Sequence, residues 1–114
     1  YGDGKQMREW IYVDDHCDGL VKIMKNGIVG SRYNIGDGVG ITNLDLIKMI
    51  LKILKTKLLI DNDDLAKHIY FVKDRLGHDR RYAINSKKIK KDCGWIPKTN
   101  FATGLEKTIS HYIK

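Results

Sequence analysis

Cysteines, histidines and long apolar runs are scarce in this sequence, and each scarcity excludes a class of protein. The two cysteines, Cys17 and Cys93, have no paired spacing, which predicts reduced thiols in a cytoplasmic protein and no disulfide framework. The 4 histidines are dispersed, so we expect no metal site. No apolar run approaches the roughly 20 residues of a membrane helix, so we expect no membrane partner. No signal peptide is visible, although the chain begins at Tyr1 rather than Met, as a fragment of a longer protein would.

Charge, by contrast, is plentiful. Of the 114 residues, 31% are charged and 42% are hydrophobic, a composition typical of one small globular domain. The net charge of +7 favours an anionic partner: nucleic acid, an acidic membrane surface or a phosphorylated small molecule. The lysine cluster at 87–91 is typical of a solvated helix face, and no aromatic side chains interleave with it. We therefore expect no nucleic-acid partner, and a small basic nucleic-acid-binding module remains an alternative.

Short strands and helices are predicted along the whole chain, with no linker or repeat. β-rich runs bounded by turn residues predict strands at 8–13, 31–35 and 69–72. The glycine-rich residues 36–40 are predicted to form a turn. An acidic turn at 61–64 is expected to cap a brief helix through His68.

The helices are predicted from their caps and apolar faces. Asp14 is expected to cap the first helix, which ends at Gly27. Thr42 and Asp45 form a capping box for a long helix with apolar residues at helical spacing. Two further helices are predicted from Ser86 to Cys93 and from about Ala102. Together they give mixed short strands and about four to five helices.

The densest charge lies in residues 74–82, which hold three arginines, two aspartates, a histidine and a glycine. Arginine presents a planar fork of donors that fits phosphate or carboxylate oxygens, and glycine lets the backbone approach a ligand closely. These residues therefore predict a loop that binds an anion. A solvated, salt-bridged loop is the structural alternative.

The wording of this stretch carries a resemblance. Residues 74–85, DRLGHDRRYAIN, are similar to the DRPGHDRRYAID signature of dTDP-glucose 4,6-dehydratases, which are extended short-chain dehydrogenase/reductase enzymes. Residues 1–16 resemble the same family's YGxGxQxRDWLYVEDH. Three further stretches fall in the family's order and spacing, at 33–36, 93–97 and 101–112.

The resemblance implies an α/β fold: the C-terminal, substrate-binding part of an extended short-chain dehydrogenase/reductase (NAD-binding Rossmann-type) fold. Residues 1–114 would form a single segment, and the N-terminal NAD-binding domain would be absent from this chain. By resemblance, residues 33–35 belong to a strand of the parallel sheet of the full-length enzyme, here called the parent.

The implied parent is an NAD-dependent lyase that converts dTDP-glucose to dTDP-4-keto-6-deoxyglucose, as a cytoplasmic homodimer. NAD would be bound by the missing part. This chain would bind the dTDP-sugar and be inactive alone.

Two stretches match the superfamily's catalytic and NAD-binding motifs only by chance, so the catalytic and NAD-binding residues are expected in the missing part. Tyr1 and Lys5 have the spacing of the catalytic Tyr/Lys pair, but two intervening glycines make the required helix costly, by about 1 kcal/mol each. Residues 36–40 are similar to the dinucleotide-binding glycine motif, but Ile41 stands where its third glycine belongs. We therefore expect no catalytic residue in this chain.

Five residues are candidates for substrate binding. By resemblance, Arg75 binds the diphosphate, and His78 lies beside it on the nucleotide side. Arg8 contacts the nucleotide portion, and Tyr1 lies near the base. Asn43 begins the long helix, where free N–H groups and the helix dipole favour anions, and its family counterpart contacts the substrate.

Structural alternatives exist for two of these candidates. Arg8 has Glu9 and Asp14 nearby as possible surface ion-pair partners. Asn43 could act only as a helix-start residue.

Two other arginines, Arg80 and Arg81, are expected to stabilise the loop through carboxylates such as Asp74 and Asp79. Leu76 departs from the proline that is usual in the family and leaves the loop looser.

Rival functions remain open at this stage. A fragment of a related UDP-sugar epimerase or decarboxylase is the most similar alternative, although the residues at 77–82 match the dehydratase signature and argue against it. A degenerate remnant that binds no ligand is another.

Overall fold

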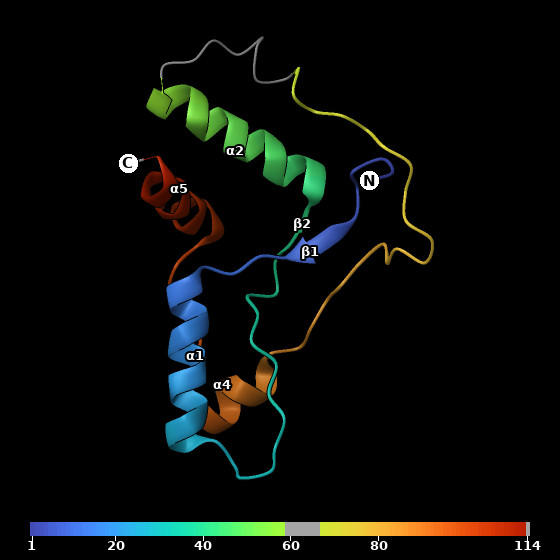
Figure 1. The fold of residues 1–114 in the computed structure, drawn as a ribbon. Coiled ribbons are helices and arrows are strands. Elements are labelled where there is room, and N and C mark those ends of the chain that lie inside the picture. Colours follow the sequence, from blue (N-terminus) through green and yellow to red (C-terminus); the bar gives the residue numbers. More distant parts are fainter. Residues whose placement is uncertain (59–66, 114) are drawn as a thin grey trace.

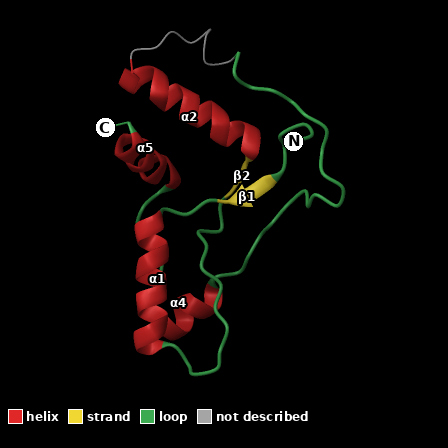
Figure 2. Ribbon diagram, in the orientation of Figure 1, coloured by secondary structure: helices red, strands yellow, loops and turns green. Residues whose placement is uncertain are grey.

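The computed structural model describes residues 1–58 and 67–113 (Figure 1). The elements of these residues are β1 (Met7–Glu9), α1 (Val13–Asn26), β2 (Gly40–Thr42), α2 (Asn43–Leu58), α4 (Lys87–Cys93) and α5 (Phe101–Tyr112). α1 and α4 lie together at one end of the molecule, α2 and α5 lie at the other, and β1 and β2 lie between them. Long irregular segments join these elements (Figure 2).

The strands β1 and β2 form a small antiparallel sheet in which Met7 faces Thr42 and Glu9 faces Gly40. Glycine at position 40 leaves room for the Met7 side chain, because a Cβ there would lie 2.6 Å from the Met7 sulfur and that side chain would have to shift. The sheet places the start of α2 directly beside the N-terminal residues of the chain.

The helix α1 is held by its C-terminal cap and its buried face. It begins at Val13 with Tyr12 at the N-cap, so the prediction of Asp14 as the cap is wrong. Asp14 lies in the first turn, where its negative charge interacts favourably with the helix dipole. The helix ends at Asn26 before Gly27, as predicted. Gly19 faces inward, because a Cβ there would approach the Trp95 ring to 3.2 Å.

The main core joins α1 to α4 and the chain that follows. Ile89, Cys93 and Trp95 are buried, and Trp95 is only 2% exposed. The indole N–H of Trp95 donates to the Asp15 carbonyl at 3.0 Å, and the Asp15 carboxylate accepts from the Thr99 amide at 2.8 Å. Both polar groups are thereby satisfied in a buried position, as burial requires.

At the other end, α2 packs beside α5. Thr42 caps α2 as predicted, because its hydroxyl accepts from the Asp45 amide at 3.1 Å, but the Asp45 carboxylate accepts from that hydroxyl at 2.6 Å rather than from the Thr42 amide. The start of α5 is close to its predicted position, and Asn100 caps it by accepting from the Thr103 amide. A Lys57–Glu106 ion pair of 3.2 Å links the two helices.

The predicted strands are the part of the fold that the structure corrects. The strand predicted at 8–13 shrinks to β1, and the stretches at 31–35 and 69–72 form no named strand. The short strand β2 arises partly from the predicted turn at 36–40. A strand needs a hydrogen-bonded neighbour, and the described residues offer 31–35 none. The predicted turn and brief helix at 61–68 fall largely on 59–66, outside the described residues.

The protein is flat and elongated, with extents of 51 × 37 × 17 Å. Its radius of gyration is 17.0 Å, whereas a compact domain of this length has about 13 Å. Apolar side chains remain exposed along one stripe of α1, including Val13 at 60%, Leu20 at 48% and Met24 at 85%. Such a stripe marks a surface suited to contact with further protein.

Replacing Trp95 tests the core. We expect Trp95→Ala to lower the free energy of unfolding by about 3–5 kcal/mol, because it leaves a cavity between α1 and α4 and removes the hydrogen bond to the Asp15 carbonyl. Urea unfolding followed by circular dichroism measures the loss. Tyr112→Ala is the matched control, since Tyr112 is 81% exposed, and an equal loss in both variants would contradict this core assignment.

Candidate functional site

The candidate site forms where residues 1–9, here called the N-terminal segment, run beside residues 74–82, here called the arginine loop. The Met7 amide donates to the Arg80 carbonyl at 2.8 Å, and the Tyr82 amide donates to the Met7 carbonyl at 3.1 Å. The Gly2 amide donates to the Val72 carbonyl at 2.8 Å. Backbone pairing therefore brings together two segments about 70 residues apart in the sequence.

Arg8 projects from β1 into the arginine loop. One Nη2 group donates to His78 Nε2 at 3.1 Å and to the Asp79 carbonyl at 3.0 Å, while Nη1 donates to the Met7 carbonyl at 2.7 Å. The guanidinium lies over the Tyr82 ring, 4.2 Å from its centroid. The carboxylates of the predicted surface ion pairs are not partners of Arg8, because Glu9 accepts instead from the amides of residues 38 and 84.

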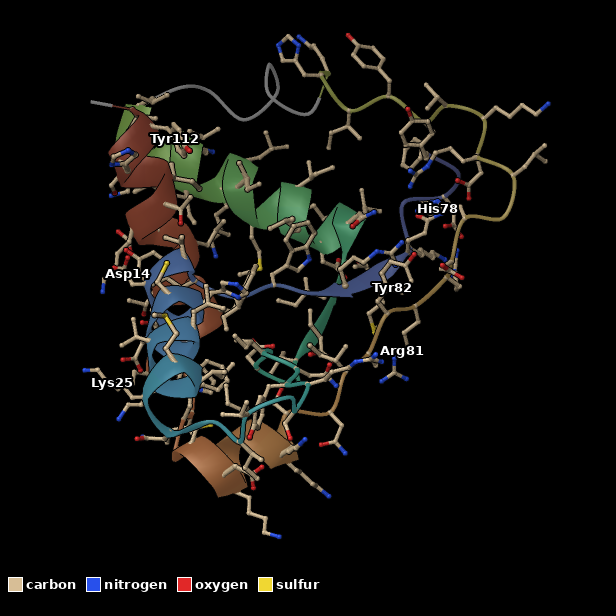
Figure 3. All side chains as sticks on the ribbon, turned by 60° about the horizontal axis from the view of Figure 1, so that its bottom comes forward. Asp14, Lys25, His78, Arg81, Tyr82 and Tyr112 are labelled. Atoms are coloured by element: carbon tan, nitrogen blue, oxygen red, sulfur yellow. The ribbon has the colours of Figure 1, made fainter. Side chains whose placement is uncertain are left out.

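His78 sits between opposite charges, with its side chain only 7% exposed. Its Nδ1 lies 2.7 Å from Asp74 Oδ1, and the second carboxylate oxygen of Asp74 accepts from Gln6 Nε2 at 2.8 Å. The hydrogen bond from His78 holds the pKa of the Asp74 carboxyl below its ordinary value. Figure 3 shows His78 and Tyr82 near one another, beside β1.

Arg75 and Tyr1 form a second pair at the edge of the site. The Arg75 guanidinium lies over the Tyr1 ring at 5.0 Å from its centroid. Among residues 1–58 and 67–113, Arg75 has no carboxylate partner. Its charge is therefore available to an anionic ligand, and the ring beneath it orients the guanidinium.

Asn43 lies at the start of α2, but the backbone N–H groups there are not free to bind an anion. The expected free N–H groups are occupied, because the Asn43 amide donates to the Gln6 carbonyl at 3.0 Å and the Leu44 amide donates to the Gly4 carbonyl at 2.8 Å. The Asp45 amide donates to the Thr42 hydroxyl. Any ligand contact from this position must come from the Asn43 side chain.

The remaining arginines of the loop differ from each other. Arg80 forms a two-bond ion pair with Asp3, at 2.7 and 3.1 Å, rather than with the expected Asp74 or Asp79. This ion pair ties the loop to the N-terminal segment. Arg81 is exposed and has no ion pair within the described part of the chain.

Tyr82 and Asp79 complete the loop's internal bonds. The Tyr82 hydroxyl donates to Asp79 Oδ2 at 2.6 Å, which raises the pKa of Tyr82. That bond fixes the ring on which Arg8 stacks, so Asp79 shapes the loop through Tyr82 rather than through the expected arginines.

The two chance motif matches have no catalytic or dinucleotide-binding geometry. Tyr1 and Lys5 are not on a helix, and the glycines between them have positive φ angles of 55° and 69°. In residues 36–40, the Gly38 amide donates to Glu9 and the Val39 amide donates to Asp37. Two carboxylates thus occupy the donors that a phosphate would need, so these residues do not fit the NAD pyrophosphate.

Other site types also lack support in the described residues. In residues 1–58 and 67–113, no three His, Cys, Asp or Glu side chains come together in a metal-binding arrangement. No helix in the part of the chain that the structure describes is long and apolar enough to cross a membrane.

Sequence reasoning missed Gln6 as a member of the site. Gln6 is 1% exposed, and its Oε1 atom has no hydrogen-bond partner in the described residues. The signal was present, because Gln6 is one of the fixed letters of the motif that residues 1–16 resemble. The burial of Gln6 beside a charged cluster depends on the tertiary structure and cannot be read from its position in the motif.

Comparisons with known proteins identify the family of this chain. The model of the family described as GDP-mannose 4,6 dehydratase matches residues 1–108. The dTDP-glucose 4,6-dehydratase of Escherichia coli is 44% identical over 117 residues, which cover 99% of this chain and 32% of that protein. The chain therefore spans about a third of the length of the relatives it matches.

Solved structures agree as well. The dTDP-glucose 4,6-dehydratase of Bacillus anthracis, in complex with NAD, matches with a TM-score of 0.81 and 39% identity, over 99% of this chain and 33% of its own. The UDP-glucose 4-epimerase of Thermotoga maritima, with UDP-glucose, matches with a TM-score of 0.83 and 28% identity, over 99% and 33%. These matches confirm the resemblance and the fold class predicted from the sequence.

The Asp3–Arg80 ion pair predicts a pH dependence of stability. The hydrogen bond from Arg80 lowers the pKa of Asp3 from 3.8 to about 2. A carboxyl whose pKa is lower in the folded protein contributes stability above its unfolded pKa and loses it as pH falls through the folded value. We expect this contribution to be present above about pH 4 and lost by about pH 2.

Urea unfolding across that pH range measures the effect. Asp3→Asn should remove this part of the acid loss, and Arg80→Gln should remove most of it, because the Lys5 amide still donates to Asp3. An acid limb as steep in both variants as in the unmodified protein would show that the pair does not contribute.

Proposed function

This chain belongs to the GDP-mannose 4,6 dehydratase family, and we propose that it forms the nucleotide-sugar-binding part of an NAD-dependent dTDP-glucose 4,6-dehydratase. The observation that carries the proposal is the convergence of Arg8, Arg75 and His78 where the N-terminal segment meets the arginine loop. A diphosphate needs cations and donors from more than one segment, and this arrangement supplies them.

Each candidate has a place in the proposed complex. Arg75 binds the diphosphate, because it is the exposed arginine that already lies over an aromatic ring and has no carboxylate partner in the described residues. Tyr1 lies under the base or its edge, where stacking is available. Arg8 faces the nucleotide portion, His78 lies beside it, and the Asn43 side chain completes the site.

The chemistry of the parent follows from its resemblance. The sugar is oxidised at C4, water is eliminated across C5 and C6, and hydride returns to C6. NAD, bound by the remainder of the parent, would accept and return that hydride. The residues of this chain bind and orient the dTDP-sugar and supply no catalytic group, so we expect the chain to be inactive by itself.

The rest of the parent would also cover exposed parts of this chain. The apolar stripe of α1 and the unpaired extended segment at 31–35 lie at the same end of the fold. We propose that this segment completes the parent's parallel sheet and that α1 packs beside it. The parent is proposed to be a cytoplasmic homodimer.

A UDP-sugar epimerase is the second candidate, favoured by the close match in shape to the Thermotoga maritima enzyme. The higher identity to dTDP-glucose 4,6-dehydratases favours the first. Calorimetric titration of the complete protein that carries this chain with dTDP and with UDP separates them. Tighter binding of UDP would support the epimerase instead.

Arg75→Ala tests the proposed site. We expect dTDP affinity to fall roughly 10- to 150-fold, because a hydrogen bond to a charged group contributes about 1.5–3 kcal/mol. The melting temperature should change little, since Arg75 supports no other described side chain through an ion pair. Calorimetric titration and thermal unfolding of the complete protein measure the two effects.

Arg81→Ala is the matched control, because Arg81 is an exposed arginine of the same loop without an ion pair in the described residues. Its dTDP affinity should stay within about twofold of the unmodified protein. A large fall in melting temperature with unchanged affinity in Arg75→Ala would identify Arg75 as a structural residue and overturn the assignment.

A further inference from the structure

The His78 ring has both of its nitrogens engaged by protein side chains. Arginine carries only donors, so the 3.1 Å contact from Arg8 requires that His78 Nε2 be unprotonated and accept. An ionised carboxylate carries only acceptors, so the 2.7 Å contact with Asp74 requires that Nδ1 be protonated and donate. The two contacts together select the neutral ring with its proton on Nδ1.

Asp74 is itself held in place. Its Oδ2 accepts from Gln6 Nε2 at 2.8 Å, and its Oδ1 also accepts from the Arg75 amide at 2.9 Å. Gln6 is 1% exposed, so the amide that orients this carboxylate lies in the interior, beneath the loop. Asp74 therefore cannot rotate away from His78 without the loss of both bonds.

We propose that His78 is a positioning residue that acts on the ligand through Arg8, with Asp74 and Gln6 fixing the tautomer that this requires. The inference rests on the proposed function for the identity of the ligand. His78 has no ring nitrogen left for a phosphate oxygen, and its side chain is 7% exposed. Arg8 has five N–H bonds, of which three donate to Met7, His78 and Asp79, so two remain for a ligand.

The benefit of this arrangement is preorganisation. A free arginine side chain loses rotamer entropy when it is fixed, and that cost falls on binding unless the protein has already fixed the side chain. Here the imidazole holds Nη2 from one side and the Tyr82 ring holds the guanidinium plane from another. A ligand would then meet an Arg8 that is already oriented.

The contact with Arg8 depends on the neutral ring of His78. Arg8 reaches it from β1, and Asp74 reaches it from the arginine loop. Protonation of Nε2 would turn an N–H toward the N–H of Arg8 and place two cations in contact. The Arg8 contact is therefore specific to the neutral ring.

A double-mutant cycle distinguishes indirect from direct action. We expect His78→Ala to weaken dTDP binding by the complete protein roughly 3- to 30-fold, as for coupled residues in contact. In an Arg8→Ala background, the same change should cost less than about twofold, because Arg8 is no longer there to be positioned. Equal losses in both backgrounds would show that His78 touches the ligand directly and would overturn the proposal.

Conservative variants supply a second readout. His78→Gln offers a carbonyl oxygen near the position of Nε2 and should retain affinity within about threefold, while His78→Asn, which reaches only the Nδ1 position, should lose as much as His78→Ala. Affinity retained by asparagine and lost by glutamine would contradict the proposal.

The ring tautomer gives a test that needs no ligand. Nitrogen-15 NMR of the ligand-free protein at neutral pH should show a single protonated ring nitrogen, Nδ1, for His78. Protonation at Nε2, or at both nitrogens, would overturn the inference. If dTDP fails to bind the unmodified protein, the proposed function fails, and the tautomer still decides whether His78 positions Arg8.

Discussion

The pairing of β1 with segments on both of its sides is the constraint on which the site depends. On one side β1 pairs with β2, which leads directly into α2. On the other side Met7 exchanges backbone hydrogen bonds with Arg80 and Tyr82 of the arginine loop. Because backbone hydrogen bonds fix the register of the two segments, this pairing brings Arg8 within hydrogen-bonding distance of His78 and places the start of α2 nearby.

The cations of the site, Arg8 of β1 and the arginines of the arginine loop, differ in their partners. Arg80 is neutralised by Asp3, and Arg8 is held by neutral acceptors and a ring, so both have defined positions. Arg75 has a ring contact but no carboxylate within the described residues, so its charge is not compensated there. A site needs both kinds: paired charges that keep the loop in shape, and an unpaired charge that attracts the anion.

The core and the site lie in different parts of the fold, and the core is stabilised more strongly than the site. The core around Trp95 is buried and fully hydrogen-bonded, whereas the arginine loop is mostly exposed and is held by a few backbone bonds and the Asp3–Arg80 pair. Exposed ion pairs contribute little stability, so the geometry of the loop depends on cooperation among several weak contacts. The exposed apolar stripe of α1 and the large radius of gyration fit a chain whose surface is completed by further protein.

The sequence by itself determined the helices, because caps and apolar periodicity are local: Thr42 and Gly27 lie where their helices begin and end. It also determined the family, because the order of motif letters needs no coordinates. The strands and the partners of the charges were decided only by the tertiary structure. A strand exists only where a neighbour pairs with it, and a carboxylate binds whichever cation folding brings within reach, so Asp3, remote in sequence, is the partner of Arg80, and the buried Gln6 orients Asp74.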